Sequence, residues 1–449
     1  MQTSAEVIVI GAGAAGLVAA CELGKRKFQV EILEARDRVG GRIYTRRDRN
    51  LNAPIEFGAE FVHGKPPEIW KRFSSFRKTL LEADGDNWCS SGSELSRCNF
   101  FDQVDKVLKK MDDKSSDESF LKFLARCWPN PQRDQRLEEA KRRATAYVSG
   151  FNAADPDLVG MHWLVESMRA EERIDGERAF RPRNGYQELL DSLEQELRTP
   201  QATIHTNAVV EAITWRPGSA QVTVQEAEGV RVREARKVLI TVPLAVLQAD
   251  AGQRGAIRFS RQLPAQKLAA LEKLEMGKVI RVVFCFRSKF WEGVRPLRGE
   301  DVTLSRLSFL LTEEELFPTW WTRAPDEFPM ITGWAPFRAA QQLSGKSESY
   351  VIQEGLAALS RVLRIPRETV EREFERAYFH DWQNDPFSRG AYSYGKVGSD
   401  GAQQTLAEPL DHTLFFAGEA TDTTGNNGTV HGAIASGLRA AKEIMNSGH

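Results

Sequence analysis

The chain has 449 residues, and its 61 lysines and arginines against 62 aspartates and glutamates leave a formal net charge of only −1. This length exceeds one ordinary hydrophobic core and predicts two intertwined domains. The balanced charge gives no reason to expect nucleic acid or an anionic membrane as the main partner. No apolar run exceeds strand length, so we expect neither a signal peptide nor a membrane anchor.

The cysteines are five in number and show no C-x-x-C spacing. An odd, scattered set predicts neither a disulfide framework nor a zinc site, so no metal is expected. A reducing cytoplasm is therefore the simplest location. The five are Cys21, Cys89, Cys98, Cys127 and Cys285.

The N-terminal region predicts a strand, a phosphate-binding loop, a helix and a second strand. Apolar residues 7–10 lead into a G-x-G-x-x-G motif, and residues 30–34 read as the second strand. Gly11 suits a tight turn, Gly13 a close approach of the backbone to a pyrophosphate, and Gly16 close packing of the helix on the sheet. The helix start also offers unpaired N–H groups to an anion.

An acidic residue follows at the spacing expected for a ribose ligand. Glu34 ends the second predicted strand, where its carboxylate can accept hydrogen bonds from ribose hydroxyls. Residues 40–42, Gly-Gly-Arg, form a second place where backbone and guanidinium can meet phosphate. Together these features predict an adenine dinucleotide, which the motif alone leaves as NAD or FAD.

Residues 34–43 resemble the flavin amine oxidases, which include monoamine oxidases, polyamine oxidases and the histone demethylases of the same fold. The resemblance implies that the dinucleotide is FAD. It also implies an α/β fold with a discontinuous (GR2-type) Rossmann FAD-binding domain and a second, substrate-binding domain of mixed sheet plus helices. In this segment the residues expected to hold FAD are Ala35, Arg36, Gly41 and Arg42.

The middle of the chain predicts that each domain is entered more than once. Residues 66 to about 180 are rich in charged, helix-compatible segments and indicate an inserted helical subdomain. Within it, the charged residues 112–118 either attract amines or form a solvated loop, and we favour the loop. The resemblance makes Val210 the residue whose backbone meets the adenine. We expect the FAD-binding domain to comprise residues 1–65, 184–262 and 395–449, and the substrate-binding domain residues 66–183 and 263–394.

A second family segment lies near the C-terminus, where residues 414–419 read as a strand and 428–437 as a loop leading into a helix. The resemblance places Gly418 and Glu419 along the ribityl and pyrophosphate part of FAD. A helix starting at Thr429 and Val430 would aim backbone amides at the flavin pyrimidine, where negative charge develops on reduction. The alternative, a C-terminal helix with Gly437 as its cap, explains Gly437 but not the earlier Gly-Glu.

Trp382 and residues 389–394 resemble polyamine oxidases and demethylases more than monoamine oxidases. Ala391 stands where monoamine oxidases carry the cysteine that binds flavin, so FAD is expected to be noncovalent, and Trp382 is assigned to the cofactor site. Tyr392 matches one ring of the aromatic cage that holds an amine over the flavin. Thr429 replaces the opposite cage tyrosine. The alternative is that Tyr392 and Trp382 are core aromatics.

Two residues in the segment 56–64 are further candidates. His63 is similar in position to a histidine that faces substrate in animal polyamine oxidases, and it could accept a hydrogen bond from an amine or simply be satisfied in a turn. Glu60 could hold a cation or pair with an arginine such as Arg42.

Arg281 departs from the family pattern, because it aligns with a lysine that usually holds a water beneath flavin N5. An arginine is larger, permanently charged and forked, so it cannot act as a neutral amine. This puts reoxidation of the flavin by oxygen in doubt more than its reduction, and leaves room for another electron acceptor.

The resemblance implies an enzyme that oxidises an amine: hydride passes from the α-carbon to flavin N5, the imine is hydrolysed, and oxygen is the expected acceptor, giving hydrogen peroxide. The substrate is expected to be a polyamine or an arylalkyl monoamine. Alternatives are an L-amino-acid oxidase, with Arg281 for the carboxylate, and a desaturase-like or protoporphyrinogen-oxidase-like enzyme. Trp320, Trp321 and Trp334 either line an apolar channel or pack in the core, which is more common.

Overall fold

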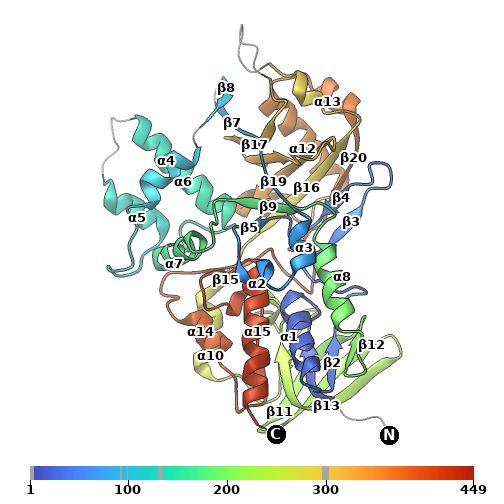
Figure 1. Ribbon diagram of the computed structural model, residues 1–449. Coiled ribbons are helices and arrows are strands. Elements are labelled where there is room, and N and C mark those ends of the chain that lie inside the picture. The colour runs from blue at the N-terminus through green and yellow to red at the C-terminus, as the bar shows by residue number, and fades with distance from the viewer. Residues whose placement is uncertain (1–4, 92–93, 99, 130–134, 296–302, 449) are drawn as a thin grey trace.

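The computed structural model describes residues 5–91, 94–98, 100–129, 135–295 and 303–448. Its chain builds two β-sheets with a group of helices beside them (Figure 1). In that view the first sheet lies at the bottom, near both termini, and the second at the top right. The helices formed by residues 100–172, labelled α4 to α7, lie at the left.

The first sheet has the strand order β10-β2-β1-β13-β12-β11-β14, and β22 pairs with β13. Strands β10, β2, β1, β13 and β22 are parallel neighbours, and the apolar runs predicted from the sequence follow from burial on both faces. Helices α1 (Ala14–Lys25) and α15 (Val430–Asn446) run side by side across one face, next to α8 (Gln187–Glu196) (Figure 1). The strands are β1 (Ala5–Ile10), β2 (Val30–Leu33), β10 (Ala202–His205), β11 (Val209–Arg216), β12 (Ser219–Glu226), β13 (Gly229–Ile240), β14 (Arg258–Phe259) and β22 (Leu414–Phe416).

The second sheet has the order β20-β16-β19-β18-β17-β7-β8 and is mixed, because β17 and β7 are parallel while its other pairs are antiparallel. Helix α12 (Glu348–Leu363) covers it, and Gly355 allows the ring of Phe284 to lie directly against that helix. The strands are β7 (Asp86–Ser91), β8 (Glu94–Arg97), β16 (Val279–Phe286), β17 (Leu307–Thr312), β18 (Thr319–Thr322), β19 (Met330–Pro336) and β20 (Phe374–Phe379).

The helical insert comprises α4 (Phe100–Leu108), α5 (Phe120–Cys127), α6 (Gln135–Phe151) and α7 (Met161–Glu172), as the charged segments predicted, and it has its own apolar core. Residues 112–118 form a loop with an exposed centre, in which Asp112 accepts backbone N–H groups and Asp113 pairs with Arg169. The solvated-loop interpretation is therefore confirmed.

Short elements join these parts. The strands of the first sheet come from three stretches of chain and those of the second from two, which confirms the predicted fold class; the exact domain boundaries stay a prediction. The connecting elements are β3 (Thr45–Arg47), β4 (Pro54–Glu56), β5 (Val62–His63), β6 (Leu80–Glu82), β9 (Ala179–Pro182), β15 (Leu274–Met276), β21 (Ser393–Gly395), α2 (Pro67–Trp70), α3 (Ser74–Lys78), α9 (Leu244–Leu247), α10 (Ala265–Lys273), α11 (Phe337–Leu343), α13 (Arg367–Glu373), α14 (Ala402–Ala407), η1 (Phe290–Gly293) and η2 (Glu419–Thr421).

The cysteines contradict one expectation. Cys89 and Cys98 form a disulfide with Cα atoms 5.6 Å apart, while Cys21, Cys127 and Cys285 are unpaired. The prediction of no disulfide was wrong because two cysteines nine residues apart become neighbours only when β7 and β8 pair as an antiparallel hairpin. The sequence spacing alone does not show that pairing.

Two further features concern the described residues only. Among them, no helix is both long and apolar enough to cross a membrane; the longest, α6 and α15, have 17 residues each. Within the same part of the chain, no three histidine, cysteine or acidic side chains are placed to hold a metal ion.

Candidate functional site

The glycine motif forms a turn and an uncapped helix start. Gly11 has φ +102°, and a Cβ on Gly16 would lie 2.1 Å from the carbonyl oxygen of Gly11, so both glycines are required by the local packing. Gly13 is the N-cap of α1, where no side chain bonds the free N–H groups, and a Cβ there would meet nothing within 4 Å. The space and the free donors in front of Gly13 suit an anion such as a pyrophosphate.

Glu34 holds this loop in place at the end of β2. Its Oε2 accepts the N–H of Ala12 at 2.9 Å and its Oε1 that of Arg36 at 3.0 Å. Arg36 in turn donates from Nη2 and Nε to Asp385 at 2.6 and 3.3 Å, and its guanidinium lies 5.9 Å from the ring centre of Trp382. The guanidinium of Arg36 is therefore bound by a protein carboxylate, and its contact with FAD stays a prediction.

Val210 and Ala35 lie at the same end of the sheet as Glu34. The N–H of Ala208 donates to the carbonyl of Glu34 at 2.9 Å, which brings the start of β11 beside this segment. Val210 is buried next to an irregularity in the β11–β12 pairing, and Ala35 is half-buried. The arrangement is compatible with the predicted adenosine site.

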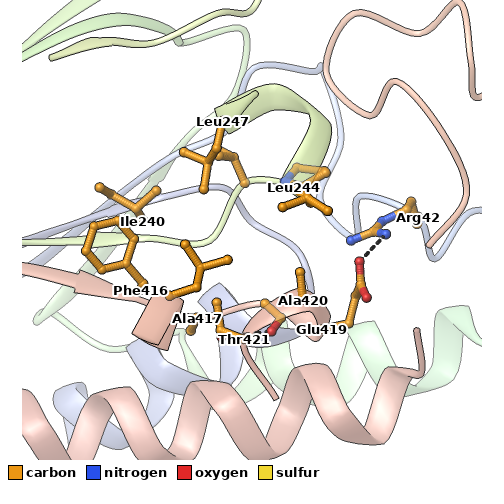
Figure 2. A pocket seen from close by; sticks show the side chains of 13 residues that line it. Arg42, Ile240, Leu244, Leu247, Phe416, Ala417, Glu419, Ala420 and Thr421 are labelled. Carbon is orange, nitrogen blue, oxygen red and sulfur yellow. Dashed lines mark hydrogen bonds and ion pairs between the residues drawn. The ribbon is translucent and has the colours of Figure 1, made fainter. Parts of the chain in front are cut away.

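A cavity opens at the carboxyl ends of β13 and β22, where ligands bind in open α/β sheets. Figure 2 shows Arg42 and Glu419 at one side of it and Leu244, Leu247 and Phe416 among the apolar lining. Arg42 Nη1 donates to Glu419 Oε1 at 2.9 Å and to the carbonyl of Ala391 at 2.8 Å. Its Nε and Nη2 have no partner among the described residues, so they can donate to a phosphate.

Glu419 joins three segments that are distant in sequence. Besides Arg42, its carboxylate accepts the Oγ–H of Ser393 at 2.6 Å and the N–H groups of Ser393 and Gly428 at 3.2 and 2.9 Å. Gly418 beside it has φ +124° and donates its N–H to Ser436 Oγ. Glu419 thus orders the lining of this cavity through protein contacts. Sequence reasoning included Ser393 in the segment 389–394 but missed its contact with Glu419, because spacing along the chain does not show that the two residues meet.

Helix α15 begins where the sequence predicted. Thr429 is its N-cap: the hydroxyl accepts the N–H of Gly432 at 2.9 Å and donates to the carbonyl of Asn426 at 2.7 Å. No described residue accepts the N–H of Val430, so this N–H can donate a hydrogen bond to a negatively charged group at the start of the helix. The Gly437 alternative is wrong, since Gly437 lies inside α15 and packs against Ala15, whose oxygen would be 2.4 Å from an added Cβ.

Two predicted residues, His63 and Tyr392, meet at Phe151, the last residue of α6. The rings of His63 and Phe151 are 5.3 Å apart, and Tyr392 Oη donates to the carbonyl of Phe151 at 2.6 Å. A Cβ on Gly428 would lie 3.2 Å from the Tyr392 ring, so this ring lies beside the residue that precedes the N-cap of α15. Neither nitrogen of His63 is hydrogen-bonded to a described residue. Phe151 carried no signal in the sequence beyond ending a helical segment.

The two histidines near this point are neutral at neutral pH. Desolvation lowers the pKa of the half-buried His63 to about 4. Burial, assisted by the charge of His63, lowers the pKa of His431 to about 3. His431 follows Val430 at the start of α15, and sequence reasoning missed it. The His63 imidazole can therefore exchange hydrogen bonds with an amine without adding positive charge. His431 is buried, and its Nε2 lies 3.2 Å from Asn426 Oδ1.

A pH prediction follows for His63. The unfolded chain binds its proton near pH 6.5 but the native state only near pH 4, so this group's contribution to stability is complete above pH 6.5 and is lost as pH falls toward 4. His63→Asn is expected to reduce the slope of unfolding free energy against pH in this window by at most about 1.4 kcal/mol per pH unit. Urea unfolding at several pH values measures the slope. His412→Asn, which removes an exposed imidazole, is the control; equal slopes in both variants would contradict the assignment.

Arg281 is bound by Glu60. Its Nη2 lies 2.5 Å from Glu60 Oε2 and its Nη1 donates to the carbonyl of Gly58 at 2.8 Å. Glu60 also accepts Trp321 Nε1 at 3.0 Å and pairs with Arg181 at 2.9 Å. Glu60 thus pairs with arginine, as one of the two interpretations expected, but the arginines are Arg281 and Arg181 and not Arg42.

These groups are almost fully buried. Burial raises the pKa of Glu60, but Arg281 and Arg181 lower it more, so the net pKa lies below the usual range. Burial also lowers the pKa of Arg281, and Glu60 partly restores it. With both terminal nitrogens occupied, Arg281 is held as a structural cation and offers little to a substrate carboxylate.

The three tryptophans divide. Trp320 is fully buried in the core of the second sheet, as the packing interpretation predicts. The ring centre of Trp321 lies 5.6 Å from that of Trp334 and 5.8 Å from that of Phe61. The ring centres of Phe61 and His63 are 5.9 Å apart. Trp321 and Trp334 therefore belong to a row of rings that reaches the group formed by His63, Tyr392 and Phe151, here named the candidate amine site.

Comparisons with known proteins identify the family of the chain. The family model "Flavin containing amine oxidoreductase" matches residues 90–445, and "NAD(P)-binding Rossmann-like domain" matches residues 9–76. Polyamine oxidase 4 of Oryza sativa subsp. japonica is 27% identical over 97% of this chain and 88% of its own length. Lysine-specific histone demethylase 1 homolog 2 of Arabidopsis thaliana is 29% identical over 99% of this chain but 59% of its own length. A solved putrescine oxidase bound to putrescine matches with a TM-score of 0.77 at 21% identity, covering 98% and 99% of the two chains.

The fold and the two family matches define a flavin-dependent oxidoreductase with a Rossmann-type domain. The chain belongs to the flavin-containing amine oxidoreductases, and it is an FAD-dependent enzyme of that family. Its own residues fit FAD: the uncapped start of α1, the open space at Gly13 and the free donors of Arg42 all face the dinucleotide-binding end of the sheet. The resemblance expected from the sequence is confirmed, with polyamine oxidases among the relatives.

Proposed function

We propose that this enzyme oxidises the carbon–nitrogen bond of a small amine, either a polyamine or an arylalkyl monoamine. The observation that carries the proposal is the meeting of His63, Tyr392 and Phe151 beside the start of α15. Aromatic faces next to an imidazole with unpartnered nitrogens suit a neutral amine better than an anion or a hydrocarbon. The polyamine and putrescine oxidases among the similar proteins support the same substrate class.

FAD, held at the start of α1 and by Arg42, would supply the two-electron acceptor that oxidises the amine to an imine, which water then hydrolyses. His63 would accept a hydrogen bond from the amine N–H, because its low pKa keeps the imidazole neutral. Tyr392 would hold the amine against its ring face, with its hydroxyl fixed on Phe151. The Val430 amide at the start of α15 would stabilise the charge of the reduced cofactor. Ala391 supplies no nucleophile, so we propose noncovalent FAD.

Oxygen is the proposed acceptor, with hydrogen peroxide as product. Arg281 is the residue that would affect reoxidation by oxygen. Its guanidinium is bound by Glu60 and the carbonyl of Gly58, and it cannot act as the neutral amine that a lysine would supply. The same binding weakens the L-amino-acid oxidase alternative, which needs a free cation for a carboxylate.

We also propose a cytoplasmic location, for which the unpaired cysteines Cys21, Cys127 and Cys285 are the support. The disulfide between Cys89 and Cys98 favours an oxidising compartment instead. The redox state of these two cysteines in the cell decides between the two locations.

The function is tested by the visible spectrum of the purified, acid-releasable flavin protein under anaerobic conditions. We expect putrescine, spermidine, benzylamine or 2-phenylethylamine to bleach the flavin band, and L-amino acids to leave it unchanged. Admitting air then shows whether oxygen restores the band and yields peroxide. Bleaching by L-amino acids alone would favour the amino-acid oxidase, and no bleaching at all would refute amine oxidation and point to a desaturase-like substrate.

A further inference from the structure

The C-terminal end of helix α6 meets the candidate amine site directly. Tyr392 Oη donates to the carbonyl of Phe151 at 2.6 Å, and Trp334 Nε1 donates to the carbonyl of Gly150 at 3.0 Å. The last carbonyls of a helix have no partner within the helix. Two aromatic side chains from outside the insert therefore cap α6 and fix its end against the site.

The ring of Phe151 is placed to touch a substrate. It is 39% exposed, although one edge meets His63 at 5.3 Å and one face stacks on Tyr147 at 5.2 Å. Phe101, in the same insert, is more exposed, at 51%, but its ring contacts only Phe100 and Tyr147 among the described rings. Phe151 thus presents apolar area next to a half-buried imidazole, where the carbon skeleton of an amine can cover it.

We propose that Phe151 is a specificity-determining residue of the amine site. Its ring contacts the carbon chain or aryl group adjacent to the reacting nitrogen, while its carbonyl holds Tyr392. This assignment rests on the proposed amine oxidation, and it makes the helical insert, through the length and end of α6, the element that selects among amines. A ring that binds the skeleton equally in the ground and transition states changes affinity more than the limiting rate.

The test compares Phe151→Ala, Phe151→Leu and the control Phe101→Ala by stopped-flow anaerobic reduction with putrescine, spermidine, benzylamine and 2-phenylethylamine. For the amine that the unaltered protein binds best, Phe151→Ala is expected to raise the apparent Kd about tenfold or more. The limiting rate should change by less than about threefold, and the ratio of Kd values across the four amines should shift. Phe151→Leu keeps an apolar side chain and the carbonyl, so its apparent Kd should lie between those of the unaltered protein and Phe151→Ala. The apparent Kd of Phe101→Ala should stay within about twofold of the unaltered value.

Three results would overturn the proposal. One is an unchanged ratio of Kd values in both Phe151 variants. Another is a loss of limiting rate that is equal for all four amines, which would make Phe151 merely structural. If Phe151→Ala does not fold, Phe151→Leu alone decides, and unaltered selectivity there refutes the role. Should none of the amines reduce the flavin of the unaltered protein, the proposed function fails first, which is a distinct outcome.

Discussion

Replacing Glu60 with glutamine is expected to lower the free energy of unfolding by about 3–5 kcal/mol at pH 7, because it leaves buried cations without their counter-charge. Glu60, Arg181 and Arg281 are respectively 5%, 3% and 6% exposed. Glutamine keeps one amide oxygen as an acceptor but supplies no charge, so the neutral carbonyls of Gly58, for Arg281, and Ala324, for Arg181, do not offset the two buried cations. Urea unfolding of purified protein measures the loss.

Glu56→Gln is a matched control for this change. Glu56 is also buried, and burial raises its pKa to about 7, but its hydrogen bonds come from the uncharged Tyr186 N–H and Thr45 hydroxyl. Arg281 acts on Glu56 through charge alone, without a hydrogen bond or ion pair. Substitution of Glu56 should cost less than half as much as that of Glu60. Equal losses in the two variants would show that the Glu60 charge does not stabilise the arginine pair.

The pH dependence of the same pair has a definite sign. The pKa of Glu60 is lower in the folded protein than in the unfolded chain, so its contribution is present above the unfolded pKa and is lost as pH falls through the folded value. The difference between Glu60→Gln and the unaltered protein should therefore shrink in acid.

Replacing Gly13 with aspartate is expected to weaken FAD binding about a thousandfold while leaving the fold intact. Gly13 has φ −79°, which any residue adopts, and an added Cβ meets nothing within 4 Å. Aspartate is also a favoured N-cap, so the flavin-free protein should be at least as stable as before. A carboxylate about 4 Å from a pyrophosphate charge costs about 4 kcal/mol at an effective dielectric of 20, which corresponds to about a thousandfold weaker binding. Flavin fluorescence titration and thermal unfolding of the flavin-free protein measure the two effects.

Two variants separate charge from space in this test. Gly13→Asn has the same shape and also caps the helix but carries no charge, so it should bind FAD more tightly than Gly13→Asp. Gly16→Ala should instead fail at folding, because its Cβ would lie 2.1 Å from the oxygen of Gly11. Retained flavin in Gly13→Asp would show that the pyrophosphate does not lie at the start of α1.

Much of the cofactor domain was predictable because its signals are local. The apolar run of β1, the glycine motif, Glu34 and the start of α15 each depend on residues close in sequence, and each lies where the pattern predicted. The separate tasks of Gly11 and Gly16 follow from backbone geometry within a single turn. Membership of the amine oxidoreductases followed from two such segments.

The sequence by itself therefore determined the class of fold and the glycine turn that opens α1, since local sterics and hydrophobic periodicity specify them, and its two family segments indicated the cofactor. Only the tertiary structure decided which groups meet across long separations. Glu60 binds Arg281 and Arg181, the Cys89–Cys98 hairpin closes as a disulfide, and Phe151 joins His63 to Tyr392. A charge or a ring pairs with whatever the packing of distant elements brings within a few ångströms, and spacing along the chain does not carry that information.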